Sequence, residues 1–550
     1  MRRVDANRVS VSVNLRDLEE LMGRKLSIDD LRELIKFVKA EIEEARDEEV
    51  ELEVTHDRPD HFSAEGLSRT LKGVLGIETG LTELEFKWSD GAAIHEVPNR
   101  RYAVFAIVHG LFLNDEALKQ LIQLQEKLST VYGRNRRRAS IGIYDLAKVE
   151  LPIEYKQVDL DKVNYVPLDS KEAIRGAQLL ETEKGKMYGE YALMNGKVPV
   201  IMDSDGNVLA VAPVLGSEIT KVDTGTRDVL MDVTAIDPKS LREVFTIFIY
   251  GLRERTRNRR VEIIGTNALT PADLSIRKWR LSLNFVNDLL GTELDQASVA
   301  SALLRARHGV NSLDGGEVEV SVAPYRLSVI HPVDLVEDVA ILHGYHNMEG
   351  VYPPSPSGGK LHPLTRLSSL VREAMVGLGA QEVLNYALTD PFLASLDGTP
   401  VKILNPISEL YSMVRTGIWP QLISTLVRNK TLTARKPKVF EVGRVAFVAG
   451  DSVVEENHLG FAVTGDEVTL TDVLVILNSL LYQLNVKPNY SSMQDRNGIN
   501  GRTVRVMVDG IPVGKAFEVN PDILIKLGLE NPAGAFEVNL DELAKIILAQ

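Results

Sequence analysis

Three acidic residues are spaced so that they could bind a divalent metal ion. Asp334, Glu337 and Asp338 stand at positions i, i+3 and i+4 of the segment HPVDLVEDVA. In a helix this spacing places the three carboxylates on one face, where they repel one another unless a cation lies among them. Mg²⁺ prefers oxygen ligands and would suit the group. An exposed acidic helix face, or acids that favour a helix N-terminus, would give the same pattern.

A second set of polar residues could line a small pocket. Asp232 and Thr234 alternate in LMDVTAID, so they share one face of an expected strand. Ser217 and Glu218 follow Gly216 in an expected turn of APVLGSEIT, not far upstream. Together these side chains could hold a hydroxyl group and a water molecule. The alternative is a set of structural polar residues at strand ends.

Other chemistry is excluded by what the sequence lacks. No P-loop, HExxH or GxSxG pattern occurs. The chain has no cysteine, which excludes disulfides and a cysteine nucleophile and fits a reducing cytoplasm. We interpret His56 and His61, which flank DRPD, as surface or loop histidines. No run of 18 apolar residues predicts a membrane helix, and the N-terminus lacks the apolar segment of a secretory signal.

The charge pattern argues against a general nucleic-acid binder. The formal net charge is −14, whereas such proteins are usually basic. Arginines do cluster within residues 134–138 and 253–260. Each cluster is either a local phosphate contact or a face paired with acids.

The 550 residues are too many for one core, and their patterns predict four units. The first, 1–90, is an α/β module: strands at 8–14 and 50–54, helical spacing from Leu15 to Ala45, and a turn and helix over 55–76. In that helix Ser63 is the expected N-cap and Gly76 the expected C′ residue. The second, 98–265, is α+β, with a hairpin at 202–210 turning on Asp205-Gly206.

The other two units differ in kind. Residues 268–350 predict a helical, winged-helix-like module, with helices in LTPADLSIRKWRLSLNFVNDLLG, ASVASALLRARHGV and HPVDLVEDVAILHGY. Proline and glycine dominate 351–360, which predicts a linker. Residues 361–550 predict an antiparallel sheet flanked by helices. The fold class is therefore α+β and multidomain.

Read together, these segments resemble the beta subunit of archaeal and eukaryotic phenylalanyl-tRNA synthetases over essentially the whole chain. HDRPDHFSAEGLSRTLKGVLG is similar to that family's N-terminal signature. VPVIMDSDGNVLAVAPVLGSEITKVDTGTRDVLMDVTA resembles its editing module, and PYRLSVIHPVDLVEDVAILHGYHNMEG its magnesium-binding helical module. ILNPISELYSMVRTGIWPQLISTLVRNK and KVFEVGRVAF resemble its degenerate class II synthetase domain.

The resemblance implies partners and site residues. The family's alpha subunit binds ATP and phenylalanine and charges tRNA-Phe, in a heterotetramer of two alpha and two beta subunits. The beta subunit scaffolds that site and hydrolyses tRNA-Phe mischarged with tyrosine. Carried over to this chain, Asp232, Thr234, Ser217 and Glu218 form the editing pocket. Asp334, Glu337, Asp338 and Ser328 form the Mg²⁺ site. The implied location is the cytoplasm, without a membrane partner.

The sequence departs from the family at three positions. Ser328 stands where the family has an aspartate ligand, Tyr144 where it often has histidine, and Gly216 where it often has asparagine. A scaffold whose editing and metal sites have decayed is one alternative hypothesis. A free-standing tRNA deacylase without an alpha partner is the other.

Overall fold

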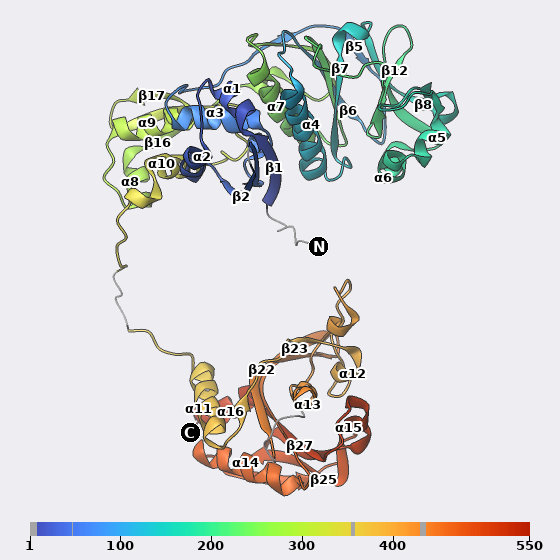
Figure 1. Cartoon of the computed structure of the whole chain (residues 1–550). Coiled ribbons are helices and arrows are strands. Elements are labelled where there is room, and N and C mark those ends of the chain that lie inside the picture. The colour runs from blue at the N-terminus through green and yellow to red at the C-terminus, as the bar shows by residue number, and fades with distance from the viewer. Residues whose placement is uncertain (1–7, 47, 354–357, 430–435, 550) are drawn as a thin grey trace. The chain divides into compact units, whose positions relative to one another are not determined.

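A computed structural model of the chain describes residues 8–46, 48–353, 358–429 and 436–549. The chain divides into two compact units, 1–351 and 352–550 (Figure 1). The boundary falls at the start of the expected linker, 351–360, of which residues 354–357 lie outside the described residues. We describe each unit by itself.

The first unit begins with a three-stranded sheet and three helices. The strands follow the order β1-β3-β2 and are antiparallel: β1 Arg8–Asn14, β3 Glu49–Thr55 and β2 Ala40–Arg46. The helices are α1 Leu15–Met22, α2 Ile28–Leu34 and α3 Ala64–Val74. Helix α3 confirms the helix expected within 55–76. Ser63 is its N-cap residue, and Gly76 just beyond its end has a φ of 71°.

The helical spacing expected from Leu15 to Ala45 is wrong in its last part. Residues 40–46 form strand β2, although alanine and glutamate favour helices. Their side chains alternate between half-buried and exposed for the first four residues, which is the period of a strand. Pairing with β3 therefore overrides the local preference.

Two five-stranded sheets form the next part of the first unit. One has the order β4-β15-β6-β14-β7 and the other β13-β12-β11-β8-β5. The strands of the first sheet are β4 Glu85–Trp88, β15 Arg260–Thr266, β6 Tyr102–Val108, β14 Val229–Ala235 and β7 Ala139–Asp145. Those of the second are β13 Leu215–Gly216, β12 Val208–Val211, β11 Lys197–Met202, β8 Ile153–Asp159 and β5 Ala92–Ile94. The expected hairpin at 202–210 is confirmed, since β11 pairs antiparallel with β12 and Gly206 has a φ of 84°.

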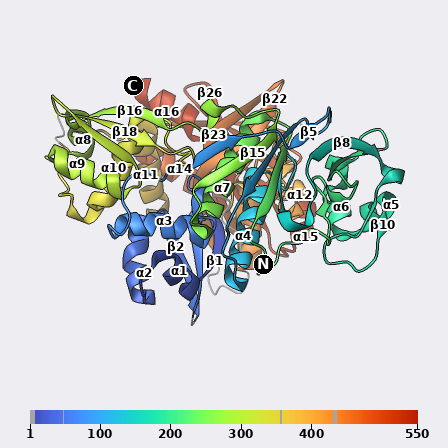
Figure 2. The ribbon, with the colours of Figure 1, turned by 90° about the horizontal axis from the view of Figure 1, so that it is seen from above.

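The two sheets lie between two layers of helices. Helices α4 Asp115–Lys127 and α7 Pro238–Leu252 pack on one face of the first sheet (Figures 1 and 2). Phe105 and Leu230 of the first sheet pack with Ile201 and Leu209 of the second, so a core lies between the sheets. Helices α5 Gly176–Glu181 and α6 Glu183–Ala192 cover the outer face of the second sheet. Strands β4 and β5 join these sheets, so they pair with 98–265 rather than with the N-terminal strands.

The last part of the first unit mixes a small sheet with helices. Its strands, in the order β16-β18-β17, are β16 Arg277–Ser282, β18 Glu317–Val322 and β17 Gly309–Leu313. The helices are α8 Leu283–Leu290, α9 Gln296–Arg305 and α10 Pro332–His343. The helix expected across LTPADLSIRKWRLSLNFVNDLLG is wrong over 277–282. That stretch is β16, where Trp279 and Leu281 point inward and Lys278 and Arg280 outward, a period of two.

A buried ionic network ties the 55–76 segment to the rest of this unit. Arg58 donates hydrogen bonds to both carboxylate oxygens of Asp60, at 2.9 and 2.8 Å. Arg69 of α3 donates to the backbone carbonyl of Tyr250 in α7, at 2.8 Å. Our interpretation of His61 as a surface residue is wrong. It is buried beside Arg58, and burial together with that positive charge lowers its pKa to about 3, so it is neutral.

The second unit is built on a seven-stranded sheet with the order β19-β22-β23-β27-β26-β25-β24. All neighbouring strands are antiparallel except β19 and β22, which confirms the antiparallel sheet flanked by helices. The strands are β19 Gln381–Glu382, β22 Lys438–Ala449, β23 Ser452–Thr464, β27 Ala533–Asn539, β26 Ile511–Val519, β25 Gly498–Val508 and β24 Pro488–Ser492. Helices α11 Pro363–Gly377, α14 Leu470–Gln483 and α16 Leu540–Ala549 pack against one another and this sheet, as do α13 Trp419–Arg428 and α15 Pro521–Leu527.

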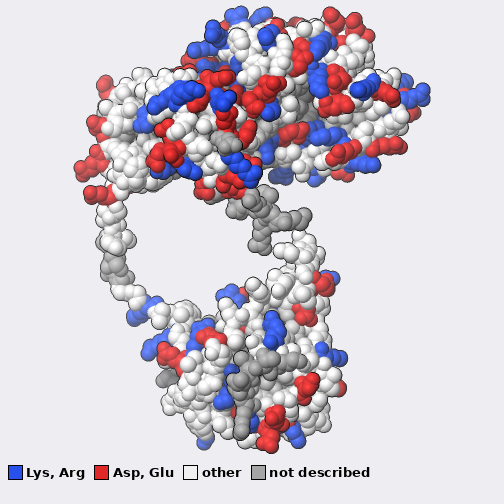
Figure 3. Space-filling view, in the orientation of Figure 1, with Lys and Arg blue, Asp and Glu red and all other residues white. Residues whose placement is uncertain are grey.

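Charges on the surface are mixed. Blue and red side chains interleave on the described residues visible in Figure 3. Much of the two arginine clusters is paired with acids: Arg136–Glu126, Arg138–Asp237, Arg253–Glu254, Arg255–Asp17 and Arg260–Glu85. In the part of the chain that the structure describes, no helix is long and apolar enough to span a membrane.

Candidate functional site

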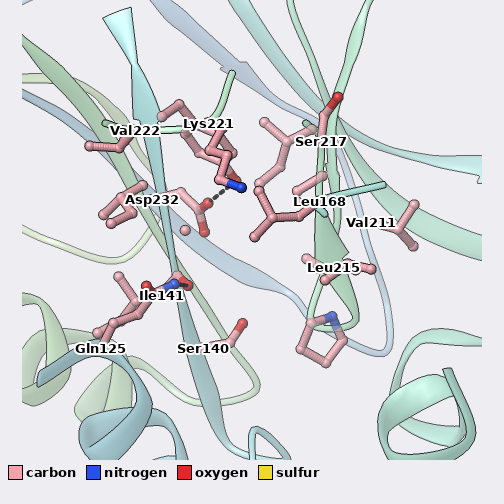
Figure 4. A pocket seen from close by; sticks show the side chains of 18 of the residues that line it. Gln125, Ser140, Ile141, Leu168, Val211, Leu215, Ser217, Lys221, Val222 and Asp232 are labelled. Carbon is pink, nitrogen blue, oxygen red and sulfur yellow. Dashed lines mark hydrogen bonds between the residues drawn. The ribbon is translucent and has the colours of Figure 1, made fainter. Parts of the chain in front are cut away.

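A cavity of about 430 Å³ opens between the two five-stranded sheets. Its walls are largely apolar, and Ile141, Leu168, Val211 and Leu215 lie around it in Figure 4. Asp232 faces this space from β14 (Figure 4). An apolar cavity with a few convergent polar groups is the usual form of a site for a small ligand.

Alternation along β14 brings Asp232 to the cavity. Val229, Met231 and Val233 pack into the core beneath the helices, whereas Leu230 packs into the core between the sheets. Because successive side chains of a strand point to opposite faces, Asp232 points between the sheets with Leu230. The shared strand face expected from the sequence is therefore present.

Asp232 is 2% exposed, and its carboxylate has an unusual environment. Burial raises its pKa to about 6, although the hydrogen bond from Tyr144 and the positive charge of Arg100 act in the opposite direction. The Tyr144 hydroxyl donates to Asp232 Oδ1 at 2.6 Å. A carboxyl whose pKa is perturbed by burial and that faces a cavity is a candidate functional group.

Thr234 lies behind the cavity rather than in its wall. It is completely buried, and its hydroxyl accepts a hydrogen bond from Arg100 Nε at 2.7 Å. Arg100 Nη2 donates to Ser140 Oγ, at 2.8 Å, and Ser140 does line the cavity. Thr234 thus fixes the position of Arg100, and Arg100 in turn fixes the position of Ser140 in the cavity wall.

Of Ser217 and Glu218, only Ser217 lies in the cavity wall. Ser217 lines the cavity with Gly216, and its hydroxyl donates to the backbone carbonyl of Val166 at 3.2 Å. Glu218 points elsewhere: its carboxylate accepts a hydrogen bond from the backbone of Asp169, at 2.7 Å. The cavity therefore brings together Asp232 and Ser217, but not Thr234 or Glu218.

Sequence reasoning missed three contributors to the site. Tyr144 and Gly142 of β7 pair with β14 opposite Leu230 and Asp232, and Arg100 precedes β6. The sequence distinguishes Tyr144 only as a departure from the family pattern. A signal was present, because Ser140, Gly142 and Tyr144 alternate in ASIGIYD and so share one strand face.

The expected metal ligands are not gathered around one point. Asp334 accepts hydrogen bonds from the backbone N–H groups of Ile330 and His331, at 2.8 and 2.7 Å, as part of the cap of α10. Glu337 instead forms an ion pair with Lys39, at 2.7 Å. Both carboxylates are thus occupied by protein donors.

Asp338 is held by a buried cation. Arg326 Nη2 donates to both of its oxygens, at 2.9 and 2.7 Å, and the His308 ring lies 2.7 Å from Oδ2. Burial alone would raise the pKa of Asp338, but the Arg326 guanidinium and the hydrogen bond from His308 hold it well below its usual value. The negative charge that a metal ion would neutralise is already balanced by Arg326.

These residues therefore do not fit a magnesium ion in this arrangement. Ser328 is half-buried and adds at most a neutral oxygen. Among residues 8–46, 48–353, 358–429 and 436–549, no group of three or more His, Cys, Asp or Glu side chains could hold a metal ion. The expected Mg²⁺ site stays a prediction from the resemblance that this geometry does not support.

Adding Mg²⁺ is expected to leave the unfolding temperature of the chain unchanged. A ligand that binds the folded state stabilises it, whereas an occupied arginine–carboxylate pair offers no vacant site. Calorimetric scans in EDTA and in millimolar Mg²⁺ test this. An increase in unfolding temperature with Mg²⁺ that disappears in Asp338→Asn would contradict it.

Three family models match the chain in succession. The B3/4 domain matches residues 116–260, the tRNA synthetase B5 domain 279–345, and the phenylalanyl tRNA synthetase beta chain CLM domain 349–540. The cavity lies largely within the region that the B3/4 model matches. The acidic triplet lies in the B5 region.

Curated relatives extend this likeness to the whole chain. A phenylalanine–tRNA ligase beta subunit from Thermofilum pendens is 37% identical over 551 residues, covering 98% of this chain and 99% of that protein. The one from Pyrobaculum aerophilum is 37% identical over 520 residues, covering 94% and 97%. A crystal structure of an N-terminal fragment of the phenylalanyl-tRNA synthetase beta subunit from Pyrococcus horikoshii aligns with a TM-score of 0.55 at 32% identity, covering 61% of this chain and all of that one. The chain belongs to the phenylalanine–tRNA ligase beta subunit family.

Proposed function

We propose that this chain scaffolds the catalytic alpha subunit of a phenylalanine–tRNA ligase and proofreads its product. The assembly is a heterotetramer of two alpha and two beta subunits, in which the alpha subunit uses ATP and Mg²⁺ to charge tRNA-Phe. The beta subunit hydrolyses tRNA-Phe that carries tyrosine. The ester bond then breaks with water, which releases free tyrosine and a tRNA with its terminal hydroxyl restored.

The observation that carries the editing role is the buried carboxylate in an apolar cavity. Tyrosine differs from phenylalanine by one hydroxyl, which a pocket built for phenylalanine cannot strongly reject, so a second site is needed. Asp232 accepts hydrogen bonds when ionised, and the tyrosine hydroxyl can donate one. Phenylalanine would leave the buried carboxylate facing an apolar ring edge, which is costly.

The cavity also suits the rest of the amino acid. In Figure 4 Asp232 and Ile141 lie on one side of the space, and Leu168 lies on the other. Apolar walls can bury an aromatic ring, while Asp232 reads its hydroxyl. Ser217 lines the same cavity; its hydroxyl donates to the backbone carbonyl of Val166, so it can offer the ester or a water molecule only an acceptor oxygen.

Support for the scaffold role comes from an apolar hairpin in the second unit, which we define as residues 401–414. At its tip Leu404, Ile407 and Leu410 are 94%, 93% and 65% exposed. Leu384, on a neighbouring segment, is 90% exposed. Several large exposed apolar side chains close together mark an interaction surface. The alpha subunit is the occupant we propose.

The hairpin is held in place at its base. Lys402 forms a β-bridge with Met413, and the Tyr411 ring lies edge-on to Tyr386, with centroids 5.8 Å apart. The exposed residues are therefore presented by an ordered element. Preorganisation of this kind lowers the entropy that binding costs.

The assembled complex tests the editing role. Supplied with tyrosine, ATP and tRNA-Phe, it is expected to release AMP repeatedly while little tyrosyl-tRNA accumulates. The chain without an alpha subunit should charge no tRNA. Stable accumulation of tyrosyl-tRNA-Phe would instead favour a scaffold without an editing activity.

A further inference from the structure

Tyr144 and Asp232, which both line the cavity, are joined by a short hydrogen bond. Gly142 is the residue directly opposite Asp232 in the register of β7 and β14, and Tyr144 lies two residues further along β7. The Tyr144 side chain reaches back diagonally, and its hydroxyl donates to Asp232 Oδ1 at 2.6 Å. Diagonal neighbours at this spacing are within reach of an aromatic side chain.

Gly142 leaves the space in which this contact forms. A Cβ atom there would lie 2.1 Å from Asp232 Oδ1 and 2.3 Å from Tyr144 Oη. Real Cβ atoms do not approach other atoms so closely, so any larger residue would push the two groups apart. The segment ASIGIYD thus contains both the donor and the space that the hydrogen bond needs.

Other charged or titratable groups near Asp232 form hydrogen bonds or ion pairs with other residues. The Arg100 guanidinium donates to Thr234 and Ser140, and the Tyr155 hydroxyl of β8 donates to the backbone carbonyl of Arg100 at 2.8 Å. Lys221, which also lines the cavity, forms an ion pair with Asp169. Among the described residues, Tyr144 is therefore the one whose side chain donates a hydrogen bond to Asp232.

An ionised carboxylate has two oxygens and about four acceptor positions. The Tyr144 hydroxyl donates to Oδ1 of Asp232, and no described residue donates a hydrogen bond to Oδ2. Asp232 also lines the cavity. A fixed carboxylate with one oxygen bonded and the other available is suited to accept one hydroxyl from a ligand.

We propose that Tyr144 is a positioning residue that sets the specificity of the editing cavity. Its hydroxyl fixes the orientation of Asp232, so that Oδ2 accepts a hydrogen bond from the phenolic hydroxyl of a tyrosyl ester. Without this donor the buried carboxylate would turn or take up a proton, and the preference for tyrosine over phenylalanine would fall. This inference rests on the editing function proposed above.

The test compares Tyr144→Phe with Tyr155→Phe in the alpha–beta complex. Both tyrosines are buried donors, Tyr144 in β7 of one sheet and Tyr155 in β8 of the other, but Tyr155 does not line the cavity. Tyr144→Phe should lower the hydrolysis of tyrosyl-tRNA-Phe about 10-fold, as for a hydrogen bond to a charged group, and should reduce the ratio of tyrosyl to phenylalanyl hydrolysis. Tyr155→Phe should keep that ratio.

The pH profile separates positioning from a general loss of structure. Editing in the unaltered complex should rise through about pH 6, as Asp232 loses its proton and becomes a full acceptor. The hydrogen bond from Tyr144 lowers the pKa of Asp232, so Tyr144→Phe should move this rise to higher pH. In Asp232→Asn the rise should be absent, with or without Tyr144→Phe.

The outcomes are distinguishable. If the unaltered complex does not hydrolyse tyrosyl-tRNA-Phe, the editing function itself fails. If it does, but Tyr144→Phe keeps the normal tyrosine preference and pH profile, only the role of Tyr144 is overturned. Should Tyr144→Phe fail to assemble, Gly142→Ala provides the second variant, because its methyl group separates the same two atoms and should move the profile in the same direction.

Discussion

Replacing Asp232 with alanine is expected to lower hydrolysis of tyrosyl-tRNA-Phe about 100-fold, so that tyrosine accumulates on the tRNA. The reason is the loss of the one carboxylate that faces the apolar cavity from β14. A hydrogen bond to a charged group contributes about 1.5–3 kcal/mol, which corresponds to roughly a 10- to 150-fold change in rate. Release of radiolabelled tyrosine from mischarged tRNA, added to the assembled complex, measures the effect.

The same complex contains its own control. Charging of tRNA-Phe with phenylalanine takes place in the alpha subunit, so Asp232→Ala should leave it unchanged. Asp232→Asn, which keeps the shape and a neutral acceptor oxygen, should lose less activity than Asp232→Ala and should show no rise near pH 6. Equal hydrolysis by Asp232→Ala and the unaltered complex would remove Asp232 from the site.

Introducing two charges at the tip of the apolar hairpin is expected to separate this chain from its alpha subunit. In Leu404→Glu/Ile407→Glu, two almost fully exposed apolar side chains are lost. Burying each contributes about 1.5–3 kcal/mol, so the loss of the pair should weaken binding about 150- to 25,000-fold. Co-purification with a tagged alpha subunit and charging with phenylalanine should both fail.

A matched control distinguishes a lost interface from lost solubility. Ile525→Glu/Val475→Glu places the same two charges on helices α15 and α14 of the same unit, where the two side chains are 73% and 56% exposed. This variant should still co-purify in equal amount with the alpha subunit. If the hairpin variant assembles as well as the control does, another surface of the chain binds the alpha subunit.

The sequence could predict the elements with clear periods and turns. The structure confirms the hairpin at Asp205-Gly206, helix α3 and helix α10, because turn residues and the helical spacing of apolar residues are local signals. Residues 40–46 and 277–282 do not match their expected helical conformation, because pairing with another strand decides it. The partner of 277–282 is β18, which lies far along the chain and outside any local window. The partner of 40–46 is β3, which follows directly, but the alanine and glutamate residues of 40–46 favour a helix locally.

For the candidate site, too, the sequence predicts the local positions of residues but not their partners from distant parts of the chain. The alternation of side chains along a strand predicts that Asp232 and Thr234 share one face. It cannot predict that the Thr234 hydroxyl accepts a hydrogen bond from Arg100. The spacing of the three acids predicts that they lie on one helix. It cannot predict that Glu337 pairs with Lys39, which lies 298 residues away in the sequence. Tyr144 and Asp232 are 88 residues apart, and only the register of β7 and β14 brings them together.

The central claim is that the cavity containing Asp232 selects tyrosine for removal. Its most direct test is the single-turnover hydrolysis of tyrosyl-tRNA-Phe and phenylalanyl-tRNA-Phe by the unaltered alpha–beta complex. We predict that the tyrosyl ester is hydrolysed at least about 100 times faster, since a site built for a hydroxyl disfavours the analogue that lacks it. Equal rates for the two esters, or rates no greater than those without the protein, would contradict the account.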